Sequence, residues 1–357
     1  MAKSRASQIK IRLSSVILPV FVIVLTARMG SLVTSACNAL FNLQWWQAGL
    51  ALLVVYKVIQ WLVWLTSTES VKGKVAVITG GGSGLGRLMA LNLAKQDAVV
   101  VLVDINRKGL VDVVNEIAAF NGLAYAHLCD VTDRDAVYSL AEQISATVGP
   151  VDIVINNAGV VSGKSLLEVS DAMAELTFDV NAVAHFWFVK AFLPSMLVRN
   201  SGHIVSIASA AGLAGVVGLS DYCASKFAAI GLMEALRLEL ARQNSEVKTT
   251  TVMPFYINTG MFDGASGIPF ILPILDAQET ADRIVLAIQR GEKMLYLPPI
   301  LGFVSLLRGI MPIGLFDYLS TLLGISASMD QFKGRGQDWH EGADNSVSIT
   351  DESDDEF

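Results

Sequence analysis

Cysteine and histidine are scarce in this sequence: the chain of 357 residues contains three cysteines and four histidines. The cysteines, Cys37, Cys129 and Cys223, are odd in number and far apart, so they outline neither a disulfide framework nor a metal site. Because no histidine clusters with cysteine either, we expect no catalytic metal. The sequence also has no Asn-x-Ser/Thr glycosylation motif, which fits a main body that faces the reducing cytosol.

Basic residues are few as well, with 26 Lys and Arg against 33 Asp and Glu. Because no basic stripe marks a nucleic-acid surface, we expect no nucleic-acid partner. The acidic excess lies in the last segment, 336–357, which has no Lys or Arg. Its acids are Asp338, Glu341, Asp344, Asp351, Glu352, Asp354, Asp355 and Glu356. Such a run is typical of a solvated, disordered tail, with a specific partner as the alternative.

Apolar residues, in contrast, make up 53% of the chain, and two long apolar runs, about 13–35 and 45–65, lie near its beginning. A helix needs ~20 apolar residues to cross a bilayer. The second run is long enough, and tryptophans near its ends suit the membrane interface. They are Trp45, Trp46, Trp61 and Trp64. We therefore predict that residues 1–70 are a membrane anchor of one or two segments.

The first of these runs has a second interpretation. Thr34–Ala36 resembles a signal-peptide cleavage site, so the run could be a cleaved signal, although the second run would still anchor the chain. Basic residues before the first run favour a cytoplasmic N-terminus. Two crossings, or a re-entrant hairpin, would then return Glu69 and the residues after it to the cytosol.

From residue 71 to 294, short β-branched runs alternate with amphipathic segments. The runs that we predict as strands are Val75–Thr79, Val99–Asp104, Tyr125–Asp130, Ile153–Asn156, His203–Ala208 and Thr249–Met253. Each is apolar through its middle, as strands buried on both faces are. The alternation predicts an α/β fold with a doubly wound parallel sheet.

The chain becomes apolar again after this domain, over Leu295–Ile325, where Arg308, Asp317 and three prolines interrupt the run. A further membrane span is one interpretation. We favour short amphipathic helices that cover the mouth of a substrate site and touch a membrane surface. Segment 295–335 is therefore predicted to contact both substrate and membrane.

The first predicted strand leads directly into a glycine-rich stretch that opens a helix. Glycines there permit a tight turn and let backbone N–H groups approach a pyrophosphate at the helix N-terminus. Strand before and helix after is the context that this motif requires. The residues that we expect to bind a dinucleotide here are Gly80, Ser83, Gly84, Leu85 and Gly86.

Asp104 ends the second predicted strand. A carboxylate at this point can accept hydrogen bonds from the adenosine ribose and repel a 2′-phosphate. We therefore expect NAD as the cofactor. NADP is the alternative, because Arg87 and Arg107 could reach a phosphate.

Tyr222 and Lys226 lie four residues apart, and so on one face of a helix. A free phenol has a pKa near 10, which a nearby ammonium lowers. Tyr222 could then exchange a proton with an alcohol or carbonyl while a hydride moves. Ser209, after a predicted strand, could donate to the same substrate oxygen, or it could simply cap a helix.

Together these residues resemble the short-chain dehydrogenase/reductase family over about 74–261. The glycine stretch matches its Thr-Gly-x-x-x-Gly-x-Gly pattern, and Asn156–Gly159 matches its Asn-Asn-Ala-Gly pattern. The resemblance implies a Rossmann-like fold, and a relay water that Asn181 holds near Lys226. It also implies that Thr259 contacts the nicotinamide carboxamide. The other cofactor contacts that it implies are Asp130, Val131, Asn157, Ala158, Gly159, Tyr222 and Lys226.

A closer resemblance, over about 71–335, is to the family's membrane-bound retinol and hydroxysteroid branch. It rests on Asn156–Gly163, His185–Pro194, Asp221–Phe227, Asn258–Phe262 and Phe332–Arg335. It implies NAD(H)-linked oxidoreduction of a lipophilic alcohol or carbonyl, all-trans-retinol or retinal first. A 17β-hydroxysteroid and a long-chain fatty alcohol are the alternatives. The endoplasmic reticulum membrane with a cytosolic catalytic domain, the lipid droplet and a homodimer are further expectations.

The alternative of another class is a catalytically idle scaffold on a lipid surface. The presence of Asn181, Ser209, Tyr222 and Lys226 argues against it, because a scaffold does not need all four. One residue departs from the family pattern: Phe255 replaces a glycine, and we expect it to narrow the nicotinamide pocket or line the substrate side.

Three further features have two interpretations each. His185 is expected to be a packed or interface residue, and Cys223 a packing residue rather than a redox switch. Met261–Phe270 could be core or a mobile substrate lid.

Overall fold

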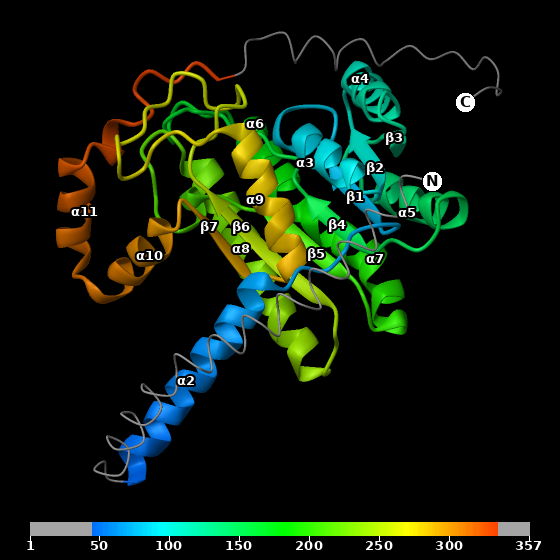
Figure 1. Ribbon diagram of the computed structural model, residues 1–357. Coiled ribbons are helices and arrows are strands. Elements are labelled where there is room, and N and C mark those ends of the chain that lie inside the picture. The colour runs from blue at the N-terminus through cyan, green and yellow to red at the C-terminus, as the bar shows by residue number, and fades with distance from the viewer. Residues whose placement is uncertain (1–44, 335–357) are drawn as a thin grey trace. The chain divides into compact units, whose positions relative to one another are not determined.

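The computed structural model describes residues 45–334 (Figure 1). The predicted apolar run 13–35 and the acidic tail 336–357 lie outside the described residues. Backbone contacts divide the chain into two compact units, Met1–Ser67 and Thr68–Phe357. The described part of the first unit is mainly one helix, α2 (Trp45–Thr66).

Helix α2 is long, and its described side chains are mainly apolar. Its 22 residues, at 1.5 Å each, give a length of about 33 Å, against ~30 Å for the hydrocarbon core of a bilayer. Large apolar side chains are exposed at nearly consecutive positions: Leu50, Leu52, Leu53, Val54, Val55, Tyr56 and Val58. Because consecutive positions point in all directions around a helix, this part of α2 is apolar on every side.

The second unit is built on a seven-stranded sheet with the order β3-β2-β1-β4-β5-β6-β7, and every neighbouring pair is parallel. The strands are β1 (Val75–Thr79), β2 (Val99–Asp104), β3 (Leu123–Leu128), β4 (Ile153–Asn156), β5 (His203–Ile207), β6 (Lys248–Pro254) and β7 (Met294–Leu297). This order reverses between β1 and β4, and ligands of such sheets bind at the carboxyl ends of the strands beside that reversal.

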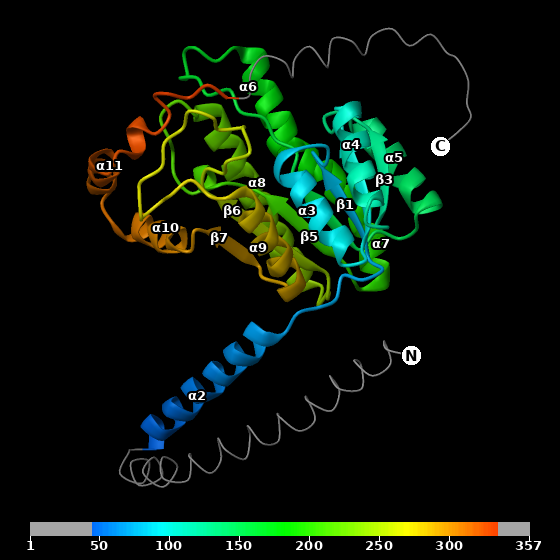
Figure 2. The same ribbon diagram turned by 45° about the horizontal axis from the view of Figure 1, so that its top comes forward.

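Helices cover both faces of the sheet, so the predicted doubly wound α/β fold is confirmed (Figure 2). One layer holds α3 (Gly84–Lys95), α4 (Arg107–Ala118) and α9 (Ala277–Arg290). The other holds α5 (Arg134–Thr147), α7 (Ala184–Arg199) and α8 (Ser220–Arg242). The middle strands β1, β4 and β5 are buried along their whole length, which explains their mainly apolar sequences.

The ends of β5 and β6 lie within one residue of the prediction, and two other strands differ more from it. Strand β3 begins and ends two residues earlier than predicted, and most of its residues are exposed or half-buried. As the edge strand it has only one neighbour, so its sequence is not uniformly apolar. Strand β7 was not predicted. It follows Gly291, which ends α9 with a positive φ of 62°, but its apolar residues run on into the next apolar segment, which hides the strand.

Helices α6 (Asp171–Phe178) and α7 are joined by a π-helical turn, Asp179–Val183. Among the described residues, the continuous stretch Asp171–Arg199 is long and apolar enough to cross a membrane, yet half of its apolar window is buried. It therefore has the burial of a core helix. The chain after β7 forms two short helices, α10 (Ile300–Ile310) and α11 (Ile313–Leu322), as the amphipathic pattern predicted.

Candidate active site

The glycine turn links β1 to α3 through a very close backbone approach. A Cβ atom at Gly86 would lie 2.1 Å from the carbonyl oxygen of Gly80, so no side chain fits there. Gly80 itself has a φ of 64°, which favours glycine. The turn can therefore bring main-chain N–H groups up to a ligand.

The N-terminus of α3 is left open toward this turn. Ser83 precedes the helix, but its side chain makes no capping hydrogen bond. In α4, α5, α6 and α9, by contrast, an Asn, Asp or Ser side chain accepts from a first-turn N–H group. The first N–H groups of α3 thus remain available to an anion, which is what a dinucleotide pyrophosphate requires.

Thr79, the last residue of β1, and Asn157, which follows the neighbouring β4, hold the turn in place. The Thr79 hydroxyl accepts hydrogen bonds from the N–H groups of Asn157 and Ala158, both 2.9 Å long. The Asn157 side-chain amide donates to the carbonyl oxygens of Thr79 and Gly80, at 2.9 and 3.2 Å. Asn157 therefore supports the glycine turn, which together with the N-terminus of α3 we call the dinucleotide cradle. Thr79, which was not among the predicted site residues, serves the same purpose, and its place at the head of the glycine motif is the signal.

Asp104 faces the same turn. One of its carboxylate oxygens accepts from the Gly82 N–H and the other from the Asn106 N–H, both at 2.9 Å. These bonds fix a negative charge at the edge of the cavity. Of the two bases that could serve a 2′-phosphate, Arg87 forms an ion pair with Glu116, whereas Arg107 lines the cavity.

A single cavity of about 740 Å³ joins these residues to the reacting side. It is lined by most of the predicted site residues: Gly80, Ser83, Leu85, Asp104, Asp130, Val131, Asn157, Ala158, Gly159, Ser209, Tyr222, Lys226 and Thr259. Gly84, Gly86 and Asn181 do not line it. The two glycines shape the turn behind the cavity wall, and Asn181 lies deeper.

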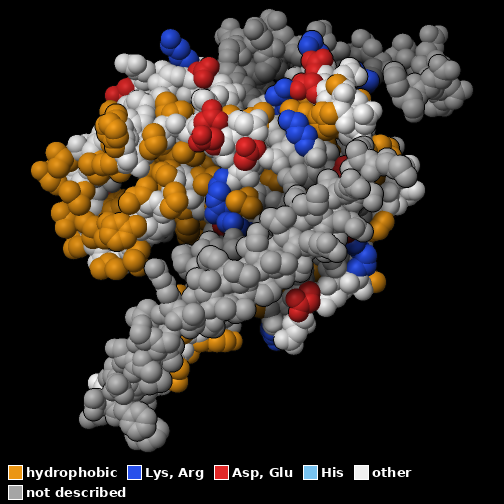
Figure 3. Space-filling model, in the orientation of Figure 1, with side chains coloured by type: hydrophobic (Ala, Val, Ile, Leu, Met, Phe, Trp, Pro, Cys, Tyr) orange, Lys and Arg blue, Asp and Glu red, His pale blue; other side chains and the backbone are white. Residues whose placement is uncertain are grey.

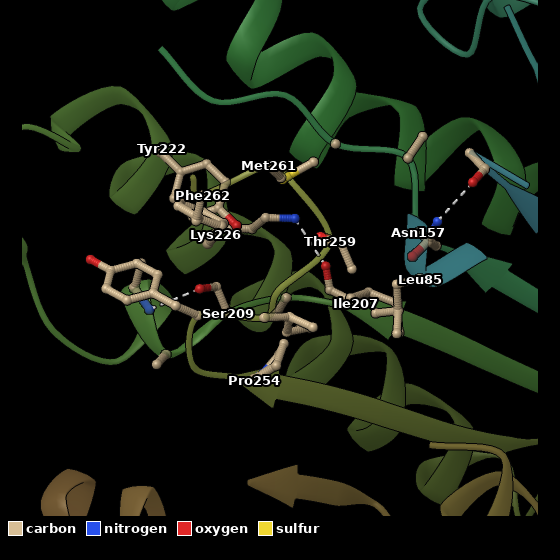
Figure 4. Close-up of a pocket in the computed structure, with 18 of the residues that line it drawn as sticks. Leu85, Asn157, Ile207, Ser209, Tyr222, Lys226, Pro254, Thr259, Met261 and Phe262 are labelled. Carbon is tan, nitrogen blue, oxygen red and sulfur yellow. Dashed lines mark hydrogen bonds between the residues drawn. The ribbon is translucent and has the colours of Figure 1, made fainter. Parts of the chain in front are cut away.

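Ser209, Tyr222 and Lys226 come together at the end of β5 and the beginning of α8 (Figure 4). All three side chains are buried. The Lys226 ammonium donates to the carbonyl oxygen of Ile207 at 2.9 Å and lies 5.6 Å from the centre of the Tyr222 ring. Ser209 also accepts from the Ala211 N–H at 3.1 Å, so it caps a 3₁₀ turn as well as facing the cavity.

Burial changes the acidity of both ionisable groups. It raises the pKa of Tyr222 above its ordinary value of 10, and a hydrogen bond with Ser209 acts in the opposite direction. Burial also lowers the pKa of Lys226 to about 8. Lys226 therefore remains largely an ammonium at neutral pH, the form that favours a phenolate beside it.

Asn181 occupies the π-helical turn and is completely buried. Its side-chain oxygen accepts from the Val160 N–H, and its amide donates to the Val160 carbonyl oxygen, both at 2.9 Å. The amide also donates to Ser225. With its side chain engaged in this way, Asn181 positions the loop after β4, and a relay water would have to use its main chain.

The other side of the cavity is aromatic, a feature that the sequence only partly revealed. Phe262 packs edge-on against Tyr222, with ring centres 5.6 Å apart, and also contacts Tyr256. Phe255, the departure from the family pattern, lines the cavity and lies 4.5 Å from the Tyr256 ring. Within Met261–Phe270, Met261 and Phe262 line the cavity, whereas Phe270 is fully exposed; a mobile lid stays a prediction.

Two distant segments complete this wall. Helices α10 and α11 contribute Leu301, Val304, Ser305, Arg308, Phe316 and Ser320 to the cavity, none of which was predicted individually. Residues 328–333 then pack against the segment after Phe262: Lys333 donates its N–H to Asp263, and Ser266 donates to Ser328, both at 2.8 Å.

Residues 74–266 match the family model described as short chain dehydrogenase. The chain belongs to this family. It is similar to epidermal retinol dehydrogenase 2 of Mus musculus, with 44% identity over 291 residues, 80% of this chain and 94% of the relative. It is also similar to estradiol 17-beta-dehydrogenase 11 of Macaca fascicularis, with 41% identity over 245 residues, 68% of this chain and 81% of the relative.

Solved structures agree with this assignment. A short-chain dehydrogenase/reductase from Burkholderia phymatum in complex with NAD has a TM-score of 0.62 and 29% identity, and the match covers 68% of this chain and 94% of that one. A metagenomic short-chain oxidoreductase in complex with NADP has a TM-score of 0.55 and 31% identity, over 64% and 96% of the two chains. This short-chain dehydrogenase is therefore an oxidoreductase that acts on CH–OH groups, and NAD, the predicted cofactor, fits its site.

Proposed function

We propose that this short-chain dehydrogenase interconverts all-trans-retinol and retinal with NAD(H). The observation that carries the proposal is the single cavity in which a dinucleotide cradle, the Ser209–Tyr222–Lys226 group and an apolar aromatic wall meet. Each buried methylene contributes ~0.8 kcal/mol of transfer free energy, so such a wall favours a long hydrocarbon. The similarity to a retinol dehydrogenase supports retinol among the candidates.

The proposed chemistry assigns one task to each polar side chain. Tyr222 takes the proton of the alcohol or returns it to the carbonyl, and Ser209 donates to the substrate oxygen. Lys226 lowers the pKa of the phenol by its charge. When bound, NAD(H) accepts or supplies the hydride. The main chain of Asn181 would bind the water that relays a proton to or from Lys226.

We further propose that NAD is preferred to NADP. The Asp104 carboxylate is held rigidly by two N–H groups at the place where a 2′-phosphate would lie, so the two charges would repel each other. Arg87, which could have offset this repulsion, is paired with Glu116.

The second candidate is a 17β-hydroxysteroid dehydrogenase, favoured by the similarity to estradiol 17-beta-dehydrogenase 11. An apolar wall alone does not distinguish a steroid or a fatty alcohol from retinol. Direct measurement does: the purified full-length protein is assayed with NAD and all-trans-retinol, estradiol, a long-chain alcohol or ethanol. We expect the highest kcat/KM for retinol.

The control is the same assay with Tyr222→Phe, which must remove the activity. A tenfold preference for estradiol would replace retinol with the steroid. Efficient oxidation of ethanol would contradict a lipophilic substrate altogether, and no turnover of any substrate would favour the idle scaffold.

We also propose that the outer surface of α10 and α11 contacts a membrane, with the endoplasmic reticulum as the expected location and the lipid droplet as a second one. Hydrophobic side chains gather on this surface (Figure 3). The most exposed of them are Phe303, Leu306, Ile310, Ile313, Leu315, Tyr318 and Leu322. Charged residues on these helices are limited to Arg308 and Asp317. Because the same helices line the cavity, substrate could enter from lipid.

Two variants test this surface. Deletion of residues 1–68 should weaken membrane pelleting without abolishing it, because α10 and α11 would still bind lipid. In the full-length protein, Ile310→Ser with Ile313→Ser should raise the KM for retinol in vesicles several-fold, at roughly 1–2 kcal/mol of lost transfer free energy. The matched control is Val198→Ser on α7, also strongly exposed. Equal KM values for the two variants would contradict the proposal.

Sedimentation of the purified protein in detergent tests the further expectation of a homodimer.

A further inference from the structure

Behind Lys226, three polar side chains are buried together in an otherwise apolar layer. Asn156 is the last residue of β4 and pairs in register with Ser206 of β5, so their side chains are neighbours on one face of the sheet. His185 of α7 packs on that face, and its Nδ1 atom lies 3.1 Å from the Ser206 hydroxyl. The exposed fractions of Asn156, His185 and Ser206 are 1%, 2% and 0%.

Two nitrogen atoms of this group have no hydrogen-bond partner among the described residues: Nδ2 of Asn156 and Nε2 of His185. A buried polar atom left without a partner destabilises the fold, so two of them in one buried group need an explanation. One is a donor, and the other accepts when Nδ1 of His185 carries the proton. A buried water typically makes about three hydrogen bonds and satisfies such a pair.

Lys226 contacts the strand that carries Ser206, through its bond to Ile207. The charge of its ammonium adds to burial in lowering the pKa of His185, to about 3, so His185 stays neutral. His185 also follows Asn181 by one helical turn. The Lys226 ammonium has three N–H donors, and one of them bonds to Ile207, the residue after Ser206.

We propose that Asn156 and His185 hold an ordered water that positions the Lys226 ammonium from behind, with Ser206 orienting the His185 ring. The water accepts hydrogen bonds from Lys226 and from Nδ2 of Asn156, and donates to Nε2 of His185. His185 is then a positioning residue that acts through Lys226. The inference rests on the proposed function only in that Lys226 acts with Tyr222, and it holds for any substrate.

The test compares three variants of the full-length enzyme. Loss of the acceptor in His185→Leu should lower kcat about tenfold, the equivalent of one net hydrogen bond of ~1.4 kcal/mol, with little change in the KM of the substrate. His185→Gln should restore most of the activity, since its amide oxygen can accept. His203→Leu is the matched control: His203 is also buried and lies at the opposite end of β5, bonded to Thr250.

We expect both leucine variants to lower the Tm, and only His185→Leu to lower kcat. Equal kcat values for the two leucine variants, or no rescue by glutamine, would reduce His185 to a packing residue. A high-resolution crystal structure of the wild type gives a readout without activity: a water within hydrogen-bond distance of both nitrogens is expected, and a dry site would overturn the proposal. Failure of the retinol assay alone leaves this readout untouched.

Discussion

The cofactor side and the substrate side of the cavity are built by different means. On the cofactor side, the glycine turn, Thr79, Asp104 and Asn157 are fixed by hydrogen bonds that end on main-chain atoms. On the substrate side, ring contacts around Phe262 and apolar side chains from α10 and α11 form the wall.

Because of this difference, the two sides of the cavity respond differently to amino-acid substitution. Main-chain groups are the same for every amino acid, so the cradle depends on a few residues whose shape or charge permits the geometry. The aromatic wall depends on side-chain size, which substitution changes directly. Substrate choice can therefore shift while the cofactor site stays as it is.

The largest effect is expected at Tyr222, where the two sides meet. Tyr222→Phe should lower kcat on the order of a thousandfold, since general acid–base catalysis contributes 10²–10⁴. NADH affinity, measured by fluorescence titration, should stay almost unchanged.

The matched control for this variant is Tyr256→Phe, which removes another buried hydroxyl in the same aromatic group, one bonded to Ser328. Its kcat should remain within a few-fold of the wild type. If Tyr222→Phe kept more than a tenth of wild-type kcat, Tyr222 would not be the acid/base.

A smaller effect is expected on the cofactor side alone. Asp104→Asn removes the charge but keeps the shape, so the ratio of kcat/KM with NADP to that with NAD should rise about tenfold, or ~1.4 kcal/mol. Asp112→Asn, on the outer face of α4 and paired with Lys108, should leave the ratio unchanged. A wild-type enzyme that already used NADP as well as NAD would contradict the proposed role of Asp104.

The smallest effects are expected for a pair of substitutions, one on each side of the cavity, that should distinguish substrate binding from cofactor binding. Phe262→Leu removes ring contacts worth about 1 kcal/mol and should raise the KM for the lipophilic substrate a few-fold, with the Kd for NADH unchanged. Val131→Ala, which trims the cofactor side, should do the reverse. Steady-state kinetics and NADH titration on both proteins measure this, and a parallel change in both constants would mean that the two sides are coupled.

The same difference explains what could be predicted from the sequence. The glycine turn, Asp104 and the Tyr222–Lys226 pair depend on local spacing, and local spacing is visible in one dimension. Strand β7 and the contributions of Tyr256, Val304 and Phe316 depend on how distant segments pack. Their sequence signal was only an apolar run, which core, membrane and pocket wall share. The place of Thr79 at the head of the glycine motif is visible in the sequence, but its partners Asn157 and Ala158 are not, because they lie far away in the chain.

The backbone bonds from Ser266 to Ser328 and from Lys333 to Asp263 bear on the order in which the protein can fold during synthesis. The cofactor cradle lies within 75–159, on four strands that are neighbours in the sheet, so it can form early during synthesis. The substrate side needs residues up to 334, which at ~5–20 residues per second emerge roughly ten to thirty-five seconds later. During that interval the nascent chain would have a dinucleotide site without its aromatic wall. The apolar surfaces that the later residues bury would meanwhile be exposed, and a chaperone or the membrane would have to bind them.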